Sequence, residues 1–444
     1  MNQLDLTTGS PLRRLLLFSL PLIGGSLFQQ LYNFIDTLIV GRLIGIDAVA
    51  AVGAYYPLSF LILGFVQGSC IGFSIPLSQS VGAKTATTRS YFTNGVWLSG
   101  GLCLLLTPLM ILGTNYFLQW LNTPNNILAM AETFTLISFI GIPANILFNY
   151  SAAALRAFGD AIHPLHFLVF SLIVNVVLDL LFICQFHLGI AGAAWATVIS
   201  EFIGGLLNLS RFFWGQNQLK LTSSDWRISW AKLKRMCAIG LPMGFEYSVS
   251  AIGAIIMQDA INQLGSAIMA AQSAADKIRQ LFTLPMESVG AAMATYQAQN
   301  FGARNRDRIK RGILNGCLIQ IIYSFGAFGI LWFSRRTLVT AILGNGSPTT
   351  TASALQYLTI IAFFFPVHGL LMIFRNTIQG WGHSFYAIVS GFGELAGRLV
   401  ASLLALTPLG FVAICYANPL AWLISLIYCG FICRFISKHG LLKP

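Results

Sequence analysis

The sequence predicts an all-α integral membrane protein, with twelve transmembrane helices in two pseudo-symmetric six-helix lobes. Of its 444 residues, 56% are hydrophobic and only 9% are charged, whereas about 25% of the residues of a soluble domain are charged. Apolar runs of about 20 residues or more recur along the chain, as helices that cross a bilayer require. The two halves of the chain also resemble each other.

The predicted spans are apolar runs separated by polar or basic loops. Transmembrane strands would instead show alternating segments of about 10 residues. No cleavable signal peptide is expected, because the first apolar run is long and continues as a span. In chain order, the spans are expected near residues 12–40, 48–78, 91–114, 126–153, 163–184, 190–213, 233–262, 267–300, 310–333, 351–375, 385–407 and 411–435.

The basic residues predict how these helices are oriented. With the N-terminus inside, 20 of the 26 Lys and Arg fall in inward loops and ends, and only Arg42, Arg335 and Arg336 fall in outward loops. Because positive residues favour the cytoplasmic side, both termini are expected in the cytoplasm, in a multi-pass protein of the cell membrane. The net charge of +12 then reflects the basic residues that mark the cytoplasmic side and contact anionic lipid headgroups. It does not indicate nucleic-acid binding.

An internal repeat divides the chain into two halves. SQSVGAKT at 78–85 aligns with AQNFGARN at 298–305, and further on AFG at 157–159 aligns with GWG at 380–382. Six spans is an even number, so both halves have the same orientation and form parallel repeats. The predicted domains are an N-terminal lobe (1–218), a cytoplasmic linker (219–232) and a C-terminal lobe (233–444).

The first span carries the residue on which the functional prediction rests. Asp36 lies inside an apolar run, where holding a carboxylate ionised costs several kcal/mol unless it faces a protein interior or a wet cavity. Gln29, Tyr32 and Asp36 are three and four residues apart, so they share one helix face. Pro21 precedes them and allows a bend. We therefore expect this face to line a cavity and Asp36 to bind and release a proton.

The fifth and sixth spans place further polar residues at a similar depth. Asn175 and Asp179 are i, i+4 neighbours in the fifth span, and Thr197 and Glu201 are i, i+4 neighbours in the sixth. Two carboxylates close together in a low dielectric cannot both ionise easily, so Asp36 and Asp179 would suit proton exchange. The alternative is that these groups are polar contacts that hold the helices together.

The second half of the chain carries a different set of charges. Glu246 and Glu287 follow Pro242 and Pro285 and have no obvious local partner, so both are candidates for the cavity. Structural pairs are expected where opposite charges are three or four residues apart, at Glu394 with Arg398 and at Asp276 with Arg279. The eight cysteines are scattered, mostly inside apolar spans, and are expected to be small buried side chains with no metal site.

Taken together and in order, these residues resemble the MATE (multidrug and toxic compound extrusion) family over the whole chain. Each of the motifs that carry this resemblance is weak alone, but their order within a six-plus-six repeat is specific. They are Pro21…Gln29-x2-Tyr32-x3-Asp36-x4-Gly41-Arg42-x2-Gly45, AVAAVGA at 48–54, Gln79-x2-Gly82-Ala83, Gln299-Asn300-x-Gly302-Ala303, Arg156-Ala157-x-Gly159-Asp160 and Asn175-x3-Asp179.

The resemblance implies a V-shaped, two-lobed antiporter that exports cationic or amphipathic drugs in exchange for H+ or Na+ by alternating access. It implies small-molecule substrates and no cofactor, and a monomer is expected. In the DinF-like branch of the family, the coupling acid lies where Asp36 stands. Its polar neighbours in that branch match Gln29, Tyr32, Asn175, Asp179 and Thr197 here.

In the NorM-like branch, acids of the seventh and tenth helices contribute to the cation site. The tenth span here (351–375) has no Asp or Glu, and Glu246 lies about one turn nearer the proline than that branch's acid. We therefore expect a DinF-like proton site in the N-terminal lobe. Na+ remains an alternative coupling ion, because it could also be bound by the oxygens of Asp36, Asn175, Asp179 and Thr197. Glu201 is atypical at its position and is expected to alter the charge preference for substrates.

Other functions stay open at this point. A flippase for lipids or lipid-linked oligosaccharides, of the same superfamily, would need a cavity rich in Arg and Lys, yet only three basic residues lie within predicted spans. An intramembrane enzyme would need a catalytic motif, and no DDxxD, HExxH or GxSxG occurs, so we expect no enzyme activity. A channel is a third possibility, but two pseudo-symmetric lobes favour alternating access.

Overall fold

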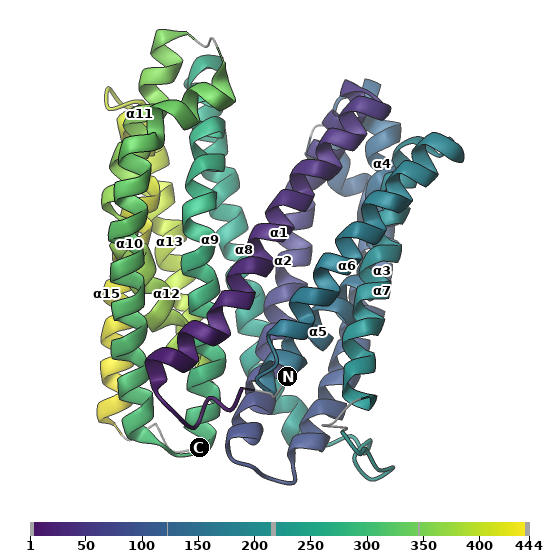
Figure 1. The fold of residues 1–444 in the computed structure, drawn as a ribbon. Coiled ribbons are helices and arrows are strands. Elements are labelled where there is room, and N and C mark those ends of the chain that lie inside the picture. The colour runs from purple at the N-terminus through teal and green to yellow at the C-terminus, as the bar shows by residue number, and fades with distance from the viewer. Residues whose placement is uncertain (1–3, 122, 215–218, 345–346, 440–444) are drawn as a thin grey trace. The chain divides into compact units, whose positions relative to one another are not determined.

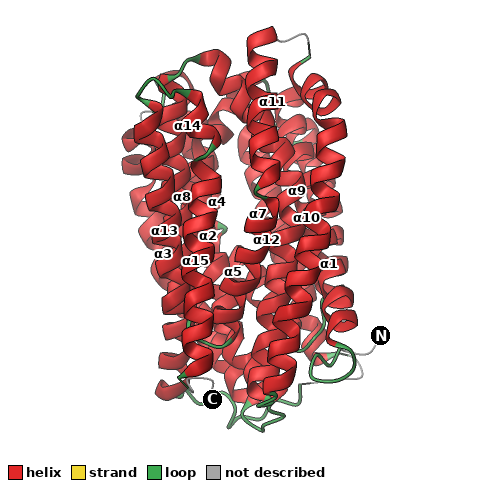
Figure 2. Ribbon diagram, turned by 90° about the vertical axis from the view of Figure 1, so that its left-hand side faces the viewer, coloured by secondary structure: helices red, strands yellow, loops and turns green. Residues whose placement is uncertain are grey.

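The fold is described by a computed structural model that covers residues 4–121, 123–214, 219–344 and 347–439. Within these residues all regular secondary structure is helical (Figure 2), so the predicted fold class is confirmed. Figure 1 shows the course of the chain. In order, the helices are α1 (Pro11–Leu43), α2 (Ile46–Gly82), α3 (Thr88–Trp120), α4 (Asn125–Ile140), α5 (Ile142–Ala157), α6 (Ile162–Leu180), η1 (Leu181–Gln185), α7 (Gly189–Phe213), α8 (Trp230–Gln263), α9 (Ser266–Gly302), α10 (Arg306–Leu343), α11 (Pro348–Phe363), α12 (Phe365–Gly380), α13 (Ser384–Ala405), α14 (Phe411–Cys415) and α15 (Ala417–Lys438).

The helices account for the twelve predicted spans. In the described parts of the chain, nine spans are long and apolar enough to cross a membrane, and two bent pairs, α4 with α5 and α11 with α12, raise the number to eleven. The remaining span is α9, which has 37 residues. Its length suffices, but its charged residues, among them Asp276, Lys277 and Arg279, lower its hydropathy.

Both bent pairs owe their break to proline. α4 and α5 meet at an angle of 46°, and α11 and α12 meet at 50°. In each pair the second helix has a proline in its first turn, Pro143 in α5 and Pro366 in α12. Proline has no N–H to donate and is best tolerated in the first turn of a helix. The break therefore falls just before each proline.

The internal repeat reappears in the backbone. α2 and α9, which are equivalent in the repeat, have 37 residues each. Each of these helices ends at a glycine of the matching turns, Gly82 in α2 and Gly302 in α9. The left-handed conformation, however, lies two residues later, on the basic residues Lys84 (φ 52°) and Arg304 (φ 56°), although it costs a non-glycine residue about 1–2 kcal/mol.

The contacts within the chain define two compact units. Unit 1 consists of Met1–Asp5 and Gly24–Gly244, and unit 2 consists of Leu6–Ile23 and Phe245–Pro444. Helices α1 and α8 therefore contribute residues to both units. The lobes predicted from the repeat, divided at 219–232, stay a prediction, and their residues 1–3, 122, 215–218, 345–346 and 440–444 lie outside the described part of the chain.

The N-terminal segment is fixed in unit 2 by one arginine. The guanidinium group of Arg308 donates hydrogen bonds to the backbone carbonyls of Leu6 (2.8 Å), Thr8 (3.2 Å) and Gly9 (2.6 Å). Asn300 adds a further hydrogen bond to the Leu6 carbonyl. This segment leads directly into α1, so the first half of α1 starts from a fixed position in unit 2.

Each unit has its own apolar core. In unit 1 the core includes the fully buried residues Phe73, Leu118 and Phe139 from α2, α3 and α4. In unit 2 it includes Tyr357 and Phe365 from α11 and α12. Within a bilayer, where lipid tails are as apolar as these side chains, helices are held together mainly by close van der Waals packing. The cores thereby hold the helices that carry the polar residues described below.

Candidate functional site

The polar residues predicted in the N-terminal half gather in unit 1, on α1, α6 and α7. Asp36 lies on α1, about two turns before its end at Leu43. Asn175 and Asp179 are fully buried on α6. Asp179 stands just before the π-helical turn η1, a type of turn that is frequent at functional sites. Three helices thus bring polar groups to one place within an apolar unit.

The two aspartates face each other. The carboxyl groups of Asp36 and Asp179 lie within hydrogen-bonding reach. Two ionised carboxylates have acceptors only, so this contact is a hydrogen bond only when one of them carries a proton. Oδ1 of Asp36 and both carboxyl oxygens of Asp179 are buried, and no donor among the described residues reaches them. A proton or a small cation between the two groups would satisfy these oxygens.

Thr197 connects the three helices of this cluster. Its hydroxyl lies 3.1 Å from the hydroxyl of Tyr32 on α1 and 3.4 Å from Nδ2 of Asn175 on α6. It also donates its own proton to the carbonyl of Ala193, one turn back on α7, at 3.2 Å. Tyr32 and Asn175 must therefore both donate to Thr197, and together these bonds orient both side chains beside the aspartates.

Glu201 is held by residues that the sequence analysis did not single out. Nδ2 of Asn145, on α5, donates to both carboxyl oxygens of Glu201, at 3.1 and 3.2 Å. Nδ2 of Asn149 donates in turn to Oδ1 of Asn145 at 3.0 Å. The i, i+4 spacing of these two asparagines just after Pro143 was the available signal. Together with Thr197 they extend the polar cluster from α1 to α5.

Not all predicted cavity residues join this cluster. The side chain of Gln29 is exposed and forms no hydrogen bond with any residue that the structure describes. Glu246 and Glu287 belong to unit 2. The structure thus brings together Tyr32, Asp36, Asn175, Asp179, Thr197 and Glu201 in unit 1.

In unit 2 Glu246 has a partner that the sequence did not reveal. Its carboxylate lies 3.0 Å from Nη1 of Arg375 on α12, and it accepts a hydrogen bond of 2.8 Å from Gln379. The sequence placed Arg375 at the cytoplasmic end of the tenth span. That placement was wrong, because α12 continues to Gly380 and Arg375 is buried. The absence of a local partner for Glu246 in the sequence was therefore no sign of a free acid.

Arg375 also starts a longer polar chain. It pairs with Glu394, which lies 3.6 Å from Arg398, so the predicted i, i+4 pair of Glu394 and Arg398 is present. Arg398 reaches Asn418, and Asn418 donates to the hydroxyl of Tyr357. Tyr357 donates to Asp276, which pairs with Arg279 at 2.8 Å as predicted. This chain crosses unit 2 from α8 to α9.

Glu287 is placed differently from the other acids of unit 2. Its side chain is 49% exposed and lies 3.8 Å from Nε2 of His368, whose ring packs 4.3 Å from that of Trp422. Among the described residues, no group of three or more His, Cys, Asp and Glu is arranged to hold a metal ion.

Known proteins are similar to this chain in sequence. The MatE family matches residues 21–181 and 242–394, which is more than half of the chain. The probable multidrug resistance protein YpnP of Bacillus subtilis is 29% identical and covers 88% of this chain and 87% of its own length. YoeA, another probable multidrug resistance protein of that species, is 26% identical over 94% of this chain and 92% of its own length.

A solved structure has the same fold. It is an outward-facing multidrug resistance MATE family transporter of the MOP superfamily, with a TM-score of 0.91 at 20% identity, and the match covers 100% of this chain and 99% of that one. The family match extends over both halves of the chain and includes Asp36 and Asp179 as well as Glu246 and Glu287. The chain therefore belongs to the MatE family.

Proposed function

We propose that this protein exports cationic or amphipathic small molecules across the cell membrane by alternating access, in exchange for protons bound at Asp36 and Asp179. Its family and its relatives support a transporter rather than an enzyme. The observation that carries the coupling role is the buried carboxyl pair, whose oxygens have no donor among the described residues. Such a pair can take up and release one positive charge, and no other covalent bond is made or broken.

A proton suits this pair better than Na+. A Na+ site at Asp36, Asn175, Asp179 and Thr197 would draw on oxygens of all four residues. The hydroxyl of Thr197 already donates to Ala193 and accepts from Tyr32 and Asn175, which uses its proton and both of its lone pairs. Only three residues then offer oxygens, and two carboxyl groups side by side need no more than one shared proton.

Ion and substrate are linked through the cluster. When Asp36 and Asp179 share a proton, the cluster loses a negative charge, and a cationic substrate nearby loses attraction. Because linkage is reciprocal, the substrate lowers the proton affinity by the same factor. Proton binding from the outside therefore favours substrate release there, and substrate binding from the cytoplasm favours proton release inward.

Dye transport into everted vesicles that contain the protein tests this proposal. The vesicles are placed under an imposed acid-inside pH gradient or under an imposed Na+ gradient. We expect transport in wild type with the pH gradient alone. Asp36→Asn should reduce it to the level of vesicles without the protein, because the amide cannot bind a proton at that place.

Asp47→Asn is the matched control, since Asp47 is an exposed acid at the start of α2 in the same unit and should leave transport unchanged. Equal transport by wild type and Asp36→Asn would disprove the coupling role. Transport driven by the Na+ gradient alone would show that Na+, and not the proton, is the coupling ion.

The flippase alternative has less support. A pyrophosphate group would need arginines that are free to bind it. Three arginines of unit 2, of which Arg375 is buried and the other two are partly buried, are each paired with a carboxylate: Arg279 with Asp276, Arg375 with Glu246 and Glu394, and Arg398 with Glu394. Their charge is already neutralised.

We further propose that both termini are cytoplasmic and that the protein acts as a monomer. The distribution of basic residues supports the orientation, and each unit carries its polar cluster within a single chain. Reporter fusions to the C-terminus test the orientation, and a periplasmic signal from such a fusion would reverse it.

A further inference from the structure

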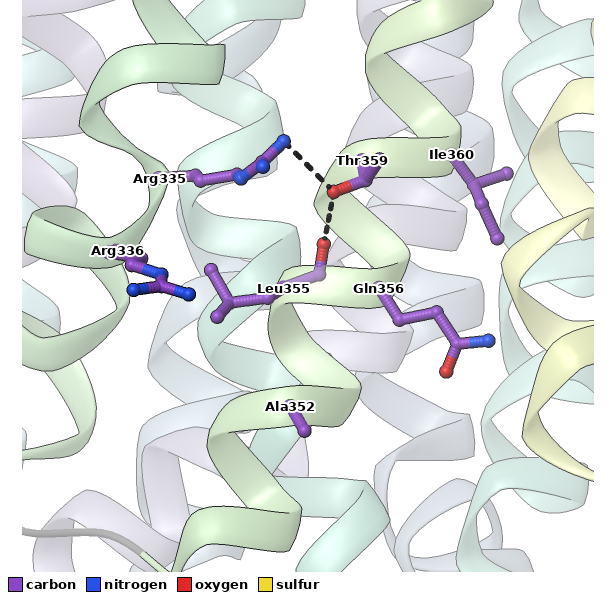
Figure 3. A pocket seen from close by; sticks show the side chains of 7 residues that line it. All are labelled: Arg335, Arg336, Ala352, Leu355, Gln356, Thr359 and Ile360. Atoms are coloured by element: carbon purple, nitrogen blue, oxygen red, sulfur yellow. Dashed lines mark hydrogen bonds between the residues drawn. The ribbon is translucent and has the colours of Figure 1, made fainter.

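We propose that a hollow between α10 and α11 binds the phosphate group of an anionic phospholipid in the outer leaflet of the membrane. The hollow has a volume of about 390 Å³, at the lower end of the range of about 300–1,000 Å³ typical of ligand pockets. It is lined by Arg335 and Arg336 from α10 and by Ala352, Leu355, Gln356, Thr359 and Ile360 from α11 (Figure 3). It belongs to unit 2 and shares no residue with the polar cluster of unit 1.

Arg335 is held in position for this role. Its Nη1 donates to the hydroxyl of Thr359 at 3.2 Å, and this hydroxyl donates to the carbonyl of Leu355 at 2.7 Å. The guanidinium group also lies 3.8 Å from the centre of the Trp332 ring, a favourable cation–π distance. Two contacts thus fix its plane while most of its N–H groups stay available. A planar fork of this kind suits the two oxygens of a phosphate group.

The charge of the hollow calls for an anion. Figure 3 shows that the guanidinium groups of Arg335 and Arg336 both extend from α10 toward α11. In the sequence, α10 carries no Asp or Glu after Asp307, and α11 carries none. No carboxylate within ion-pair distance of either arginine is found among the described residues. Two adjacent positive charges at a membrane surface are therefore left to be balanced by a ligand.

The depth of the arginines matches that of lipid headgroups. Residues 312–334 of α10 carry no charge, and at about 1.5 Å per residue they span about 34 Å, close to the hydrocarbon thickness of about 30 Å. Basic residues flank this stretch on both sides, with Arg306–Arg311 at one end and Arg335 and Arg336 at the other. The two arginines therefore lie at the boundary opposite the basic cluster, which the charge bias assigns to the outer leaflet.

The surface below the hollow suits an acyl chain. Phe333 is 87% exposed and Ile330 is 63% exposed on α10, and Trp332 is partly exposed beside them. Aromatic residues at this level are typical of the membrane interface. A phospholipid could thus bind with its phosphate at the arginines and one chain along α10. A free inorganic anion offers the same charge but would not use this apolar surface.

Native mass spectrometry of the purified full chain tests the proposal. The protein is titrated with phosphatidylglycerol, with a diacylglycerol of the same chains, and with inorganic phosphate. We expect wild type to retain phosphatidylglycerol and to bind diacylglycerol and phosphate much more weakly. Arg335→Gln combined with Arg336→Gln should bind phosphatidylglycerol about tenfold more weakly, since charge-assisted hydrogen bonds are lost.

The control is Arg42→Gln, which removes the third outward basic residue and should leave binding unchanged. Thr359→Val keeps both charges and should weaken binding roughly threefold through the lost orientation of Arg335, which tests the site even if the double variant fails to fold. Equal binding of diacylglycerol, or wild-type binding by the folded double variant, would overturn the proposal. Phosphate that binds as tightly as phosphatidylglycerol would make the hollow a site for free anions instead.

Discussion

Thr197 is the residue on which the geometry of the unit 1 cluster depends most. Its hydroxyl is the common partner of Tyr32 from α1 and Asn175 from α6, and its own proton is committed to Ala193. It carries no charge and cannot itself bind a proton. Its contribution is to hold the side chains beside Asp36 and Asp179 in one arrangement, which makes it a positioning residue.

Replacing Thr197 separates positioning from proton binding. Thr197→Val keeps the shape but leaves the Tyr32 hydroxyl and the Asn175 amide without an acceptor, which should cost about 1–3 kcal/mol of stability per buried group. We expect a lower unfolding temperature and a shifted pH dependence of dye transport, with transport still present. Thr197→Ser restores the acceptor and should behave like wild type. Identical pH profiles for the valine and serine variants would contradict this role.

Glu201 offers a second test at the level of a single residue. Its carboxylate is held by Asn145 and adds a negative charge to the cluster. Glu201→Gln keeps the size and removes the charge, so export of a cationic dye should fall relative to export of a neutral amphipathic dye. Glu132→Gln on α4 serves as the control because Glu132 lies outside the cluster. An equal loss for both dyes would show that Glu201 is needed for structure only.

At the scale of helices, Arg375 joins three elements of unit 2. It is anchored on α12 and contacts Glu246 on α8 and Glu394 on α13. Removing one partner from a buried ion pair leaves an uncompensated charge and typically costs 3–5 kcal/mol. The pairing thus holds α8, α12 and α13 together.

The corresponding experiment is a double-mutant cycle on thermal unfolding. Arg375→Gln should lower the unfolding temperature strongly, and adding Glu246→Gln should recover part of the loss because one unpaired charge is removed. Lys277→Gln, an exposed basic residue of α9 in the same unit, should change little. Strictly additive effects of Arg375→Gln and Glu246→Gln would show that the two side chains do not interact.

The sequence predicted some elements of this site well and others not at all. Asp36, Asp179 and their neighbours were found because a polar residue stands out in an apolar run and helical spacing shows which residues share a face. The pairing of Glu246 with Arg375 was not found, because it depends on helices far apart in the chain. The tenth span was predicted to end at residue 375, whereas α12 continues to Gly380. This error in the end of one span was enough to place Arg375 at the membrane surface.

At the scale of the whole molecule, the chain passes between the two units three times. The crossings follow Asp5, Ile23 and Gly244. Two of them fall inside helices, within three residues of Pro21 in α1 and of Pro242 in α8. Each half of the sequence therefore contributes a piece of helix to the unit built mainly from the other half.

This connectivity predicts how the molecule responds to a cut. A protease site inserted after Ser223, in the linker, would yield fragments 1–223 and 224–444. We expect both fragments to migrate together in size-exclusion chromatography after cleavage, because 6–23 remain packed in unit 2 and 230–244 in unit 1. The uncleaved insertion variant is the control. Separation of the fragments in mild detergent would show that these contacts are too weak to hold the molecule together.

The hold of Arg308 on the N-terminal segment also bears on synthesis of the chain. Residues 6–23 leave the ribosome long before the residues of unit 2 that receive them. At about 5–20 residues per second, Arg308 is added about 14–57 s after Ile23. Throughout that interval the nascent first half-helix lacks this partner, so lipid or the insertion machinery must shelter it.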